Sequence, residues 1–321
     1  MISRRLLRIK AMHILYAYFR AEDKSINKFE NELFYSIDKF YELYYYLLIL
    51  INDVKDYFES RIELAKQKHI KTDEDLNPNT KFIDNRVIKL IENNDGLNRY
   101  IKEKKLNWNN NNELLKNLYN EIKNSKDYNE YMNNNDDSFS KDKNYIINIY
   151  KDIFQNSDLL YQILEDLSIY WNDDIEFVLS MIIQTLQRLN EGDNEYKFIR
   201  SLYKNNEDRE FVKQLFRKTI INHEETKIII EKNAKNWDAE RIALIDFLIM
   251  EMAITEITEF SSIPINVSFN EYIEIVKFYS TRKSGVFING ILDKIIKELK
   301  KDNKIEKKGR GLLEKKEYNR L

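Results

Sequence analysis

The N-terminal stretch RRLLRIKAMHILYAYF carries three arginines and a tyrosine on one side of a predicted helix. Arg4 and Arg8 lie one turn apart with Arg5 beside them, and Tyr16 falls on the side of Arg5 at about 100° per residue. Guanidinium groups bind phosphate with paired hydrogen bonds, and a tyrosine ring can stack on an unpaired base. Cations at a helix N-terminus also oppose the macrodipole. The stretch therefore favours contact with RNA or DNA, and an ordinary solvated helix start is the alternative.

A second cationic segment, STRKSG, lies near the C-terminus and carries Arg282 and Lys283. It reads as a short connection ahead of a helix for which Ser284 is the expected N-cap. Free backbone N–H groups and two cations at a helix start suit a phosphate. A merely solvated loop explains the same composition equally well.

The residue types needed for catalysis are absent or scattered. The chain has no cysteine, which excludes thiol catalysis and cysteine-based zinc sites. Its three histidines, His13, His69 and His223, lack the spacing of metal ligands. Neither a GxGxxG nor a P-loop pattern occurs in the sequence. We therefore expect a protein that is not an enzyme and that has no metal site and no cofactor.

Composition predicts an all-α fold. The 321 residues are 43% hydrophobic but include only six glycines and two prolines, too few for the many turns of a sandwich or barrel. The longest apolar run, Leu43–Ile51, is far shorter than the roughly 20 residues of a membrane span. The N-terminus also lacks the apolar core of a secretory signal. A cytoplasmic protein without a membrane segment is the expectation.

Charge is unevenly distributed along the chain. Residues 1–20 have five basic and no acidic side chains, and residues 301–321 have eight basic against four acidic ones. The net charge of the whole chain is −2, so the long segment 21–205 holds an excess of nine negative charges. Basic ends on an acidic body predict that a polyanion is bound at the ends.

Apolar periodicity predicts the main helices. One covers about Ser3–Arg20, and a long one covers about Ile26–Gln67, either continuous or with one break. The segment WDAERIALIDFLIMEMAITEIT is apolar nearly all round, as in the centre of a bundle. In the last predicted helix, Ser284–Leu299, Gly290 is unexpected, because glycine there costs about 1 kcal/mol relative to alanine. Close approach of a neighbouring helix would explain it. The charged tail beyond Leu299 reads as disordered.

The segment PINVSFNEYIEIVKFYSTRKSGVFINGILDKI closely resembles the C-terminal signature of the NusB transcription antitermination family. Most positions of that signature match, and the first helix resembles the family's R-R-x-x-R and A-x-x-x-L-Y patterns. The matching residues are Pro264, Val267, Asn270, Glu271, Glu274, Lys277, Ser284, Phe287, Asn289, Gly290, Leu292, Asp293 and Lys294, with Arg4, Arg5, Arg8, Ala11, Leu15 and Tyr16 in the first helix.

The resemblance implies a fold of two small packed helical subdomains and divides the chain into four parts. Residues 1–20 would form the first helix of the NusB-like bundle and residues 206–300 the remaining helices. Residues 21–205 would then be a large, mostly helical insertion of unknown role. Residues 301–321 would be a charged, disordered tail.

The resemblance also implies a function and a site. Family members bind single-stranded boxA of nascent ribosomal RNA together with NusE, a small-subunit ribosomal protein, within the RNA polymerase antitermination complex. The resemblance assigns Tyr16 and Asp246 to the NusE side or the shared RNA edge. It assigns to RNA the residues Arg4, Arg5, Arg8, Arg282, Lys283, Ser284 and Phe287. The turn Phe287–Gly290 would help to position the RNA-facing loop.

Three residues depart from the family pattern. Lys283 stands where an acid is usual, Glu251 where some members have arginine, and Asp246 where a glutamate is usual. A lysine at the first position should strengthen phosphate attraction, whereas Glu251 should weaken RNA contact on its face. The alternative function is a helical protein-interaction scaffold without specific RNA binding, because the acidic insertion is the larger part. The family also allows a homodimer that hides the arginines.

Overall fold

The computed structural model describes residues 2–193, 198, 202, 203, 205–234 and 242–313. These residues form two compact units, and the all-α prediction is confirmed because the described elements are helices. Unit 1 comprises residues 1–37 and 202–321, and unit 2 comprises residues 38–201. Unit 2 is thus inserted in the sequence of unit 1. The chain passes from unit 1 into unit 2 within α2 (Ile26–Lys66). The predicted boundaries of the insertion, 20/21 and 205/206, stay predictions.

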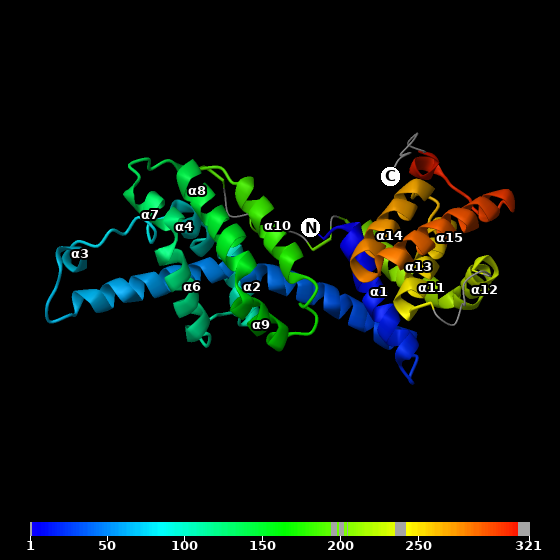
Figure 1. Cartoon of the computed structure of the whole chain (residues 1–321), viewed down its shortest axis with the longest axis horizontal. Coiled ribbons are helices and arrows are strands. Elements are labelled where there is room, and N and C mark those ends of the chain that lie inside the picture. The colour runs from blue at the N-terminus through cyan, green and yellow to red at the C-terminus, as the bar shows by residue number, and fades with distance from the viewer. Residues whose placement is uncertain (1, 194–197, 199–201, 204, 235–241, 314–321) are drawn as a thin grey trace. The chain divides into compact units, whose positions relative to one another are not determined.

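Unit 1 consists of α1, the start of α2 and the helices after residue 205 (Figure 1). Their bounds are α1 Arg4–Arg20, α2 Ile26–Lys66, α11 Asn206–Ile221, α12 His223–Asn233, α13 Leu244–Glu259, α14 Ile265–Tyr279 and α15 Arg282–Lys301, followed by a 3₁₀ turn at Gly309–Leu312.

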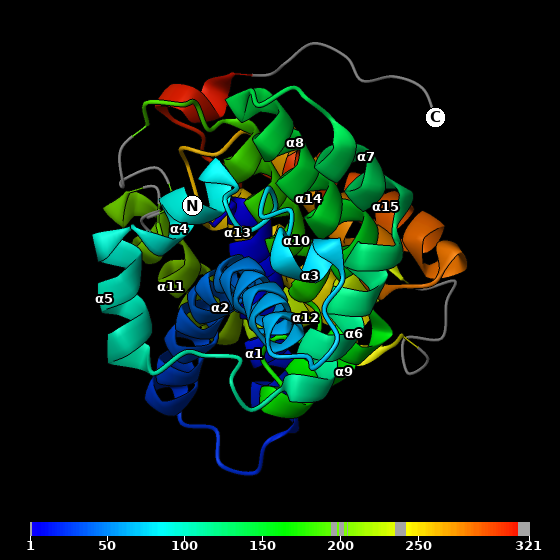
Figure 2. The same cartoon turned by 90° about the vertical axis from the view of Figure 1, so that its left-hand side faces the viewer.

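Unit 2 contains the rest of α2 and shorter helices that pack around it (Figures 1 and 2). These are α3 Asp73–Leu76, α4 Arg86–Glu92, α5 Asp95–Lys104, α6 Asn112–Asn124, α7 Lys126–Asn133, α8 Phe139–Asn148, α9 Asp158–Leu167 and α10 Ile175–Gln187, with a π-helical segment Ile149–Ile153 and a 3₁₀ turn Phe154–Asn156 after α8.

Side chains of unit 2 hold α2 by its backbone as well as by its apolar surface. Trp108 donates its indole N–H to the carbonyl of Tyr46 at 2.9 Å, and Trp171 donates to that of Lys39 at 2.8 Å. The buried Tyr150 hydroxyl lies 2.8 Å from the carbonyl of Leu48. Because unpaired polar groups are costly to bury, these bonds allow aromatic rings to pack directly on the helix. Trp108 lies in an asparagine-rich segment, yet its side chain is fully buried.

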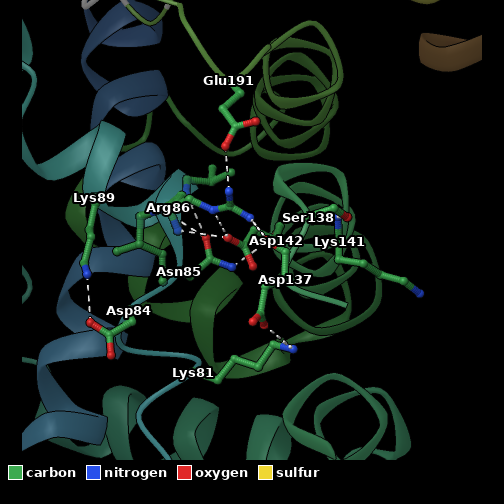
Figure 3. A network of polar contacts seen from close by, with 12 residues as sticks. Lys81, Asp84, Asn85, Arg86, Lys89, Asp137, Ser138, Lys141, Asp142 and Glu191 are labelled. Atoms are coloured by element: carbon green, nitrogen blue, oxygen red, sulfur yellow. Dashed lines mark hydrogen bonds and ion pairs between the residues drawn. The ribbon is translucent and has the colours of Figure 1, made fainter. Parts of the chain in front are cut away.

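Arg86 at the start of α4 joins three segments of unit 2 (Figure 3). Its guanidinium donates to the buried Asp142 of α8 at 2.9 Å and to Glu191, after α10, at 2.6 Å. Asn85 caps α4 through its side-chain oxygen and donates its amide N–H to the carbonyl of Asp142. The network fixes polar segments of unit 2 to one another, and its charges are already paired.

A buried ion pair lies at the centre of unit 1. Arg8 of α1 donates to both carboxylate oxygens of Glu256 of α13, at 2.8 and 2.6 Å, and only 2% of Arg8 and none of Glu256 is exposed. Glu256 also accepts from Ser268 Oγ and Tyr272 Oη of α14, at 2.7 and 3.0 Å. Burial alone would lower the pKa of Arg8, but the Glu256 carboxylate raises it above its usual value. One carboxylate therefore connects three helices.

Residues 302–313 pack on unit 1. Lys308 N donates to the carbonyl of Ser261 at 2.9 Å, and Ile305 contacts the apolar cluster of Ile257, Ile265 and Ile296. The prediction of a disordered tail is wrong for these residues. The remainder of the predicted tail, 314–321, lies outside the described residues.

The glycine inside α15 does not allow a close helix contact. A Cβ added to Gly290 would meet nothing within 4 Å, and Gly290 and Asn289 are both exposed. The helix also continues without a turn through Phe287–Gly290. Both structural explanations that the sequence suggested for this glycine are therefore wrong.

Glu251 of α13 is buried beside His223, the first residue of α12. Its Oε1 lies 2.8 Å from His223 Nδ1 and accepts from Thr226 Oγ1 at 3.0 Å. Its other oxygen is buried without a partner among the described residues. Burial raises the pKa of Glu251 to about 8 and lowers that of His223 below its usual value. With none of its side chain exposed, Glu251 offers no surface that could weaken RNA contact, contrary to the sequence-based expectation.

Replacing Arg8 by methionine should lower the free energy of unfolding of unit 1 by about 3–5 kcal/mol, because it leaves the Glu256 carboxylate buried without its countercharge. The double variant Arg8→Met/Glu256→Leu should be more stable than the single one. Arg4→Met, at a half-exposed pair, should cost about 1 kcal/mol or less. Urea unfolding followed by circular dichroism measures all three, and equal costs for Arg8→Met and Arg4→Met would contradict the assignment.

Stability should fall as pH rises from about 7 to about 8, the folded-state pKa of Glu251. An acid whose pKa is raised on folding holds its proton more tightly in the folded state, so unfolding above the ordinary pKa of Glu251, 4.5, releases a proton. The free energy of unfolding should decrease by up to about 1.4 kcal/mol per pH unit until the folded pKa is reached. Burial lowers the pKa of His223, so its contribution has the opposite sign and is largest below its ordinary pKa of 6.5. Glu251→Gln should remove the slope, and a slope unchanged in that variant would refute its origin in Glu251.

Gly290→Ala should raise the free energy of unfolding by about 0.5–1 kcal/mol, because the new methyl group enters open space within a helix. Thermal unfolding compared with Asn289→Ala, at the neighbouring exposed position, separates the glycine effect from a general surface effect. Destabilisation by Gly290→Ala would show that the position is crowded.

Candidate nucleic-acid interface

Arg282 and Lys283 lie in the first turn of α15, not in a loop before it. Thr281 is the N-cap, since its Oγ1 accepts from the backbone N–H of Ser284 at 3.1 Å. The predicted N-cap, Ser284, is therefore the third residue of the helix, and its hydroxyl oxygen lies 3.0 Å from Thr281 Oγ1. Both cations are exposed and form no ion pair with another described residue. This helix start carries two available positive charges.

The helices α1 and α14 run in parallel and connect this helix start to the N-terminal arginines. Arg5 binds Glu271 of α14, and eight residues further along both helices the ring of His13 lies 5.3 Å from that of Tyr279. Eight helical residues span about 12 Å. Because Arg282 follows Tyr279 after two residues, the arginine end and the α15 helix start lie at the two ends of one helix pair.

The N-terminal arginines are bound to acidic side chains of unit 1. Arg5 makes two hydrogen bonds of 2.9 Å to Glu271, which raise its pKa. Arg4 donates to Asp208 of α11 at 2.7 Å, and its guanidinium lies 5.0 Å from the centre of the Phe211 ring. About a third of each arginine side chain is exposed, 35% and 38%. Each can thus present part of its guanidinium to an external anion.

Arg8 does not belong to the surface. It lies in the core pair with Glu256 and its exposed fraction is 2%. The sequence placed it with Arg4 and Arg5 because of the one-turn spacing, but that spacing cannot show which guanidinium points inward. The prediction that Arg8 faces RNA is therefore corrected, and Arg8 positions α1 instead.

Tyr16 and Asp246 lie near an open pocket at the C-terminal half of α1. The pocket has a volume of about 510 Å³ and is lined by His13, Tyr16, Arg20, Ala243, Leu244 and Ile245. The Arg20 guanidinium lies 5.4 Å from the centre of the Tyr16 ring and donates to its hydroxyl. Asp246 is buried in the first turn of α13, two residues after Leu244. The pocket offers apolar helix-end residues with an aromatic and a cationic group at one side.

Two exposed apolar side chains near α15 were not found from the sequence. Phe278 is 75% exposed at the end of α14, and Val286 is 74% exposed one turn into α15, whereas the predicted site residue Phe287 is half-buried. On a helical wheel of α14, Phe278 lies to one side of the buried face, so the wheel could have indicated that its side chain is exposed. Together with Arg282 and Lys283, they give this corner a mixed cationic and apolar surface, which is typical of single-stranded nucleic-acid sites.

No group of three or more histidine, aspartate or glutamate side chains that could hold a metal ion occurs in the described part of the chain. Within the same residues no helix is long and apolar enough to span a membrane.

Comparison with known proteins identifies the family of residues 176–297. The NusB family model matches residues 176–297, from the start of α10 to near the end of α15, so the match does not include α1. The match starts at residue 176, within unit 2, whereas the C-terminal part of the NusB-like bundle was predicted to start at residue 206. No solved structure matches the chain significantly.

Three curated relatives carry the name transcription antitermination protein NusB. That of Salinibacter ruber is 47% identical over 105 residues, 33% of this chain and 66% of the relative. That of Chloroherpeton thalassium is 41% identical over 106 residues, 33% of this chain and 50% of the relative. That of Acetivibrio thermocellus is 41% identical over 93 residues, 29% of this chain and 64% of the relative. The chain thus spans between half and about two thirds of these relatives, and it contains a domain of the NusB family.

Proposed function

We propose that this chain is a non-catalytic transcription antitermination factor that binds boxA of nascent ribosomal RNA together with NusE in the cytoplasm. The observation that carries the proposal is the pair of exposed cations, Arg282 and Lys283, in the first turn of α15 of a NusB family domain. Phosphate groups are favoured there by the two charges and by the helix N-terminus. The names of the matched relatives support the same function.

The proposed RNA path follows the parallel helices α1 and α14. It starts at Arg282 and Lys283, passes His13 and Tyr279, and ends at Arg5 and Arg4. At the first end the cations are available, whereas at the second a phosphate must share the guanidinium groups with Glu271 and Asp208. We therefore assign the larger part of the RNA affinity to the α15 end. Ser284 and Phe287 orient this helix start, since both are partly buried.

NusE is assigned to the pocket beside Tyr16. The Tyr16 ring already has Arg20 over one face, so an RNA base would have to displace Arg20 or use the other face. A protein partner can instead fill the apolar part of the pocket formed by Leu244 and Ile245. The buried Asp246, the next residue of α13, is assigned to the same partner side. The RNA polymerase complex would then be joined through NusE. A homodimer that covers Arg4 and Arg5 would compete with RNA.

The second candidate function is a protein-interaction scaffold without specific RNA binding. The observation in its favour is the acidic insertion, whose segment 21–205 carries the excess negative charge of the chain. A scaffold predicts low RNA affinity at every salt concentration, because acidic surfaces repel phosphate.

The test is fluorescence anisotropy of boxA RNA and a scrambled RNA, with and without NusE, over a range of salt concentrations. The chain should prefer boxA, more tightly when NusE is present. Arg282→Ala/Lys283→Ala should weaken binding and reduce the slope of log K against log salt by about 1.4, since each single-strand phosphate contact contributes about 0.7.

The matched control is Lys232→Ala/Lys297→Ala, which removes the same charge from exposed positions on α12 and the C-terminal half of α15. It should leave the slope nearly unchanged. No preference for boxA and no effect of NusE would overturn the antitermination function and favour the scaffold.

A further inference from the structure

The segment Asp302–Leu313, here called the C-terminal strap, is held on the corner between α13 and α14 by several independent contacts. Its backbone bonds to Ser261 through Lys308 N, and Lys307 Nζ donates to the carbonyl of Phe260 at 2.9 Å. Phe260 is the C-cap of α13, so the Lys307 ammonium group also interacts favourably with the negative end of the dipole of that helix. Ile305 adds an apolar anchor. The strap therefore has a defined place in unit 1.

Gly311 is required for this docking. A Cβ at Gly311 would lie 1.9 Å from the carbonyl oxygen of Ser261 and 3.0 Å from its carbon, both backbone atoms that cannot move aside cheaply. Gly309, two residues earlier, has a φ of +55°, which favours glycine as well. The close approach lets the strap turn in a 3₁₀ helix directly against the corner.

The docked strap is linked to the arginine end of the proposed RNA path through packed aromatic rings. Phe260, whose carbonyl Lys307 binds, has its ring 5.3 Å from that of Phe211, and the Arg4 guanidinium lies over the Phe211 ring at 5.0 Å. Burial lowers the pKa of Lys307 to about 8, against a smaller opposing effect of the Glu256 carboxylate. Arg4 and the strap, far apart in sequence, are thus connected within unit 1 through two packed aromatic rings.

The strap presents two exposed cations. Arg310 is exposed and forms no ion pair with another described residue. Lys308 is 69% exposed and its only described ion pair is with Glu306, itself 78% exposed, at 3.0 Å. An ion pair between such exposed groups is weak, so Lys308 can exchange Glu306 for another anion. Both cations are held by a fixed backbone, which reduces the ordering cost of binding.

We propose that the C-terminal strap is a second phosphate-binding element, in which Lys308 and Arg310 extend the single-stranded RNA path beyond Arg4. The inference rests on the proposed function, because it is the continuity with the Arg4–Arg5 end that selects an RNA backbone over another polyanion. The strap would bind RNA without preference for base sequence, since its contacts go to phosphate groups. It adds affinity for RNA longer than boxA itself.

Two variants test the proposal in the full chain. Lys308→Ala/Arg310→Ala removes the two charges and leaves the docking contacts, whereas Gly311→Val keeps the charges and displaces the strap from Ser261. Each is compared with Lys232→Ala/Lys297→Ala, which removes equal charge elsewhere. The probes are boxA RNA alone and boxA RNA extended by a uridine stretch at its 5′ or its 3′ end. Thermal unfolding of each variant reports whether unit 1 is still folded.

The unaltered chain should bind one of the two extended RNAs several-fold more tightly than boxA alone. Lys308→Ala/Arg310→Ala should lose that gain and reduce the salt slope on the extended RNA by about 1.4, while affinity for boxA alone stays near that of the unaltered chain. Gly311→Val should lose the same gain. The control variant should keep it.

Three results would overturn the proposal. If the unaltered chain binds boxA but Lys308→Ala/Arg310→Ala binds the extended RNA equally well, the strap is not an RNA contact and the proposed function stands. If strap variants lose NusE binding in the absence of RNA, the strap is a protein contact. If the unaltered chain binds no RNA at any salt concentration, the proposed function fails together with the strap proposal.

Discussion

The arrangement of unit 1 depends on the buried ion pair between Arg8 and Glu256. Two ions taken out of water stabilise a fold only when their remaining hydrogen-bonding positions are filled, and here Ser268 and Tyr272 fill those of the carboxylate. The pair joins helices that unit 2 separates in the sequence. Where the chain returns from that unit, Leu202 accepts from the backbone N–H of Ile2 at 3.0 Å, which holds the start of α1 near the returning chain. A long insertion is compatible with such a core because loop-closure entropy grows slowly with length.

The same residue type takes three roles in the proposed interface, and burial decides which. Arg8 is enclosed and positions α1, while Arg4 and Arg5 share their guanidinium groups between an internal carboxylate and the surface. Arg282 is exposed and available. An internal partner such as Glu271 fixes the orientation of a long side chain before a ligand arrives, which lowers the entropy lost on binding. It also reduces the net charge that the ligand meets. The affinity therefore comes mainly from the exposed end and the orientation from the paired end.

Much of the fold could be predicted from the sequence, because helix periodicity and capping are local. The predicted first helix, about Ser3–Arg20, and the long helix, about Ile26–Gln67, agree with α1 and α2 within a residue or two. The site was harder to predict because exposure depends on distant residues. The buried partners of Arg8 and Glu251 lie on other helices, and no local pattern names them. The N-cap of α15 is Thr281 and not Ser284, because both residue types can cap a helix and the local sequence does not show which of them does. This changed Arg282 and Lys283 from loop to helix residues.

Gly290 and Gly311 show why composition alone gave a wrong prediction of disorder for residues 302–313. Gly290 drew attention because it interrupts a helix, yet its surroundings are open, whereas Gly311 stands among charged residues and meets a backbone carbonyl. A charged segment folds when a few groups are buried at low cost. Here Ile305 packs on an apolar cluster, and Lys307 buries part of its aliphatic chain while its ammonium group donates to the end of α13. Gly311 permits the close approach of the strap backbone to Ser261. The remaining charges of the strap stay in water, so its high charge and its ordered backbone are compatible. A basic terminal segment docked in this way keeps its cations at a fixed place, which a disordered tail of the same composition cannot do.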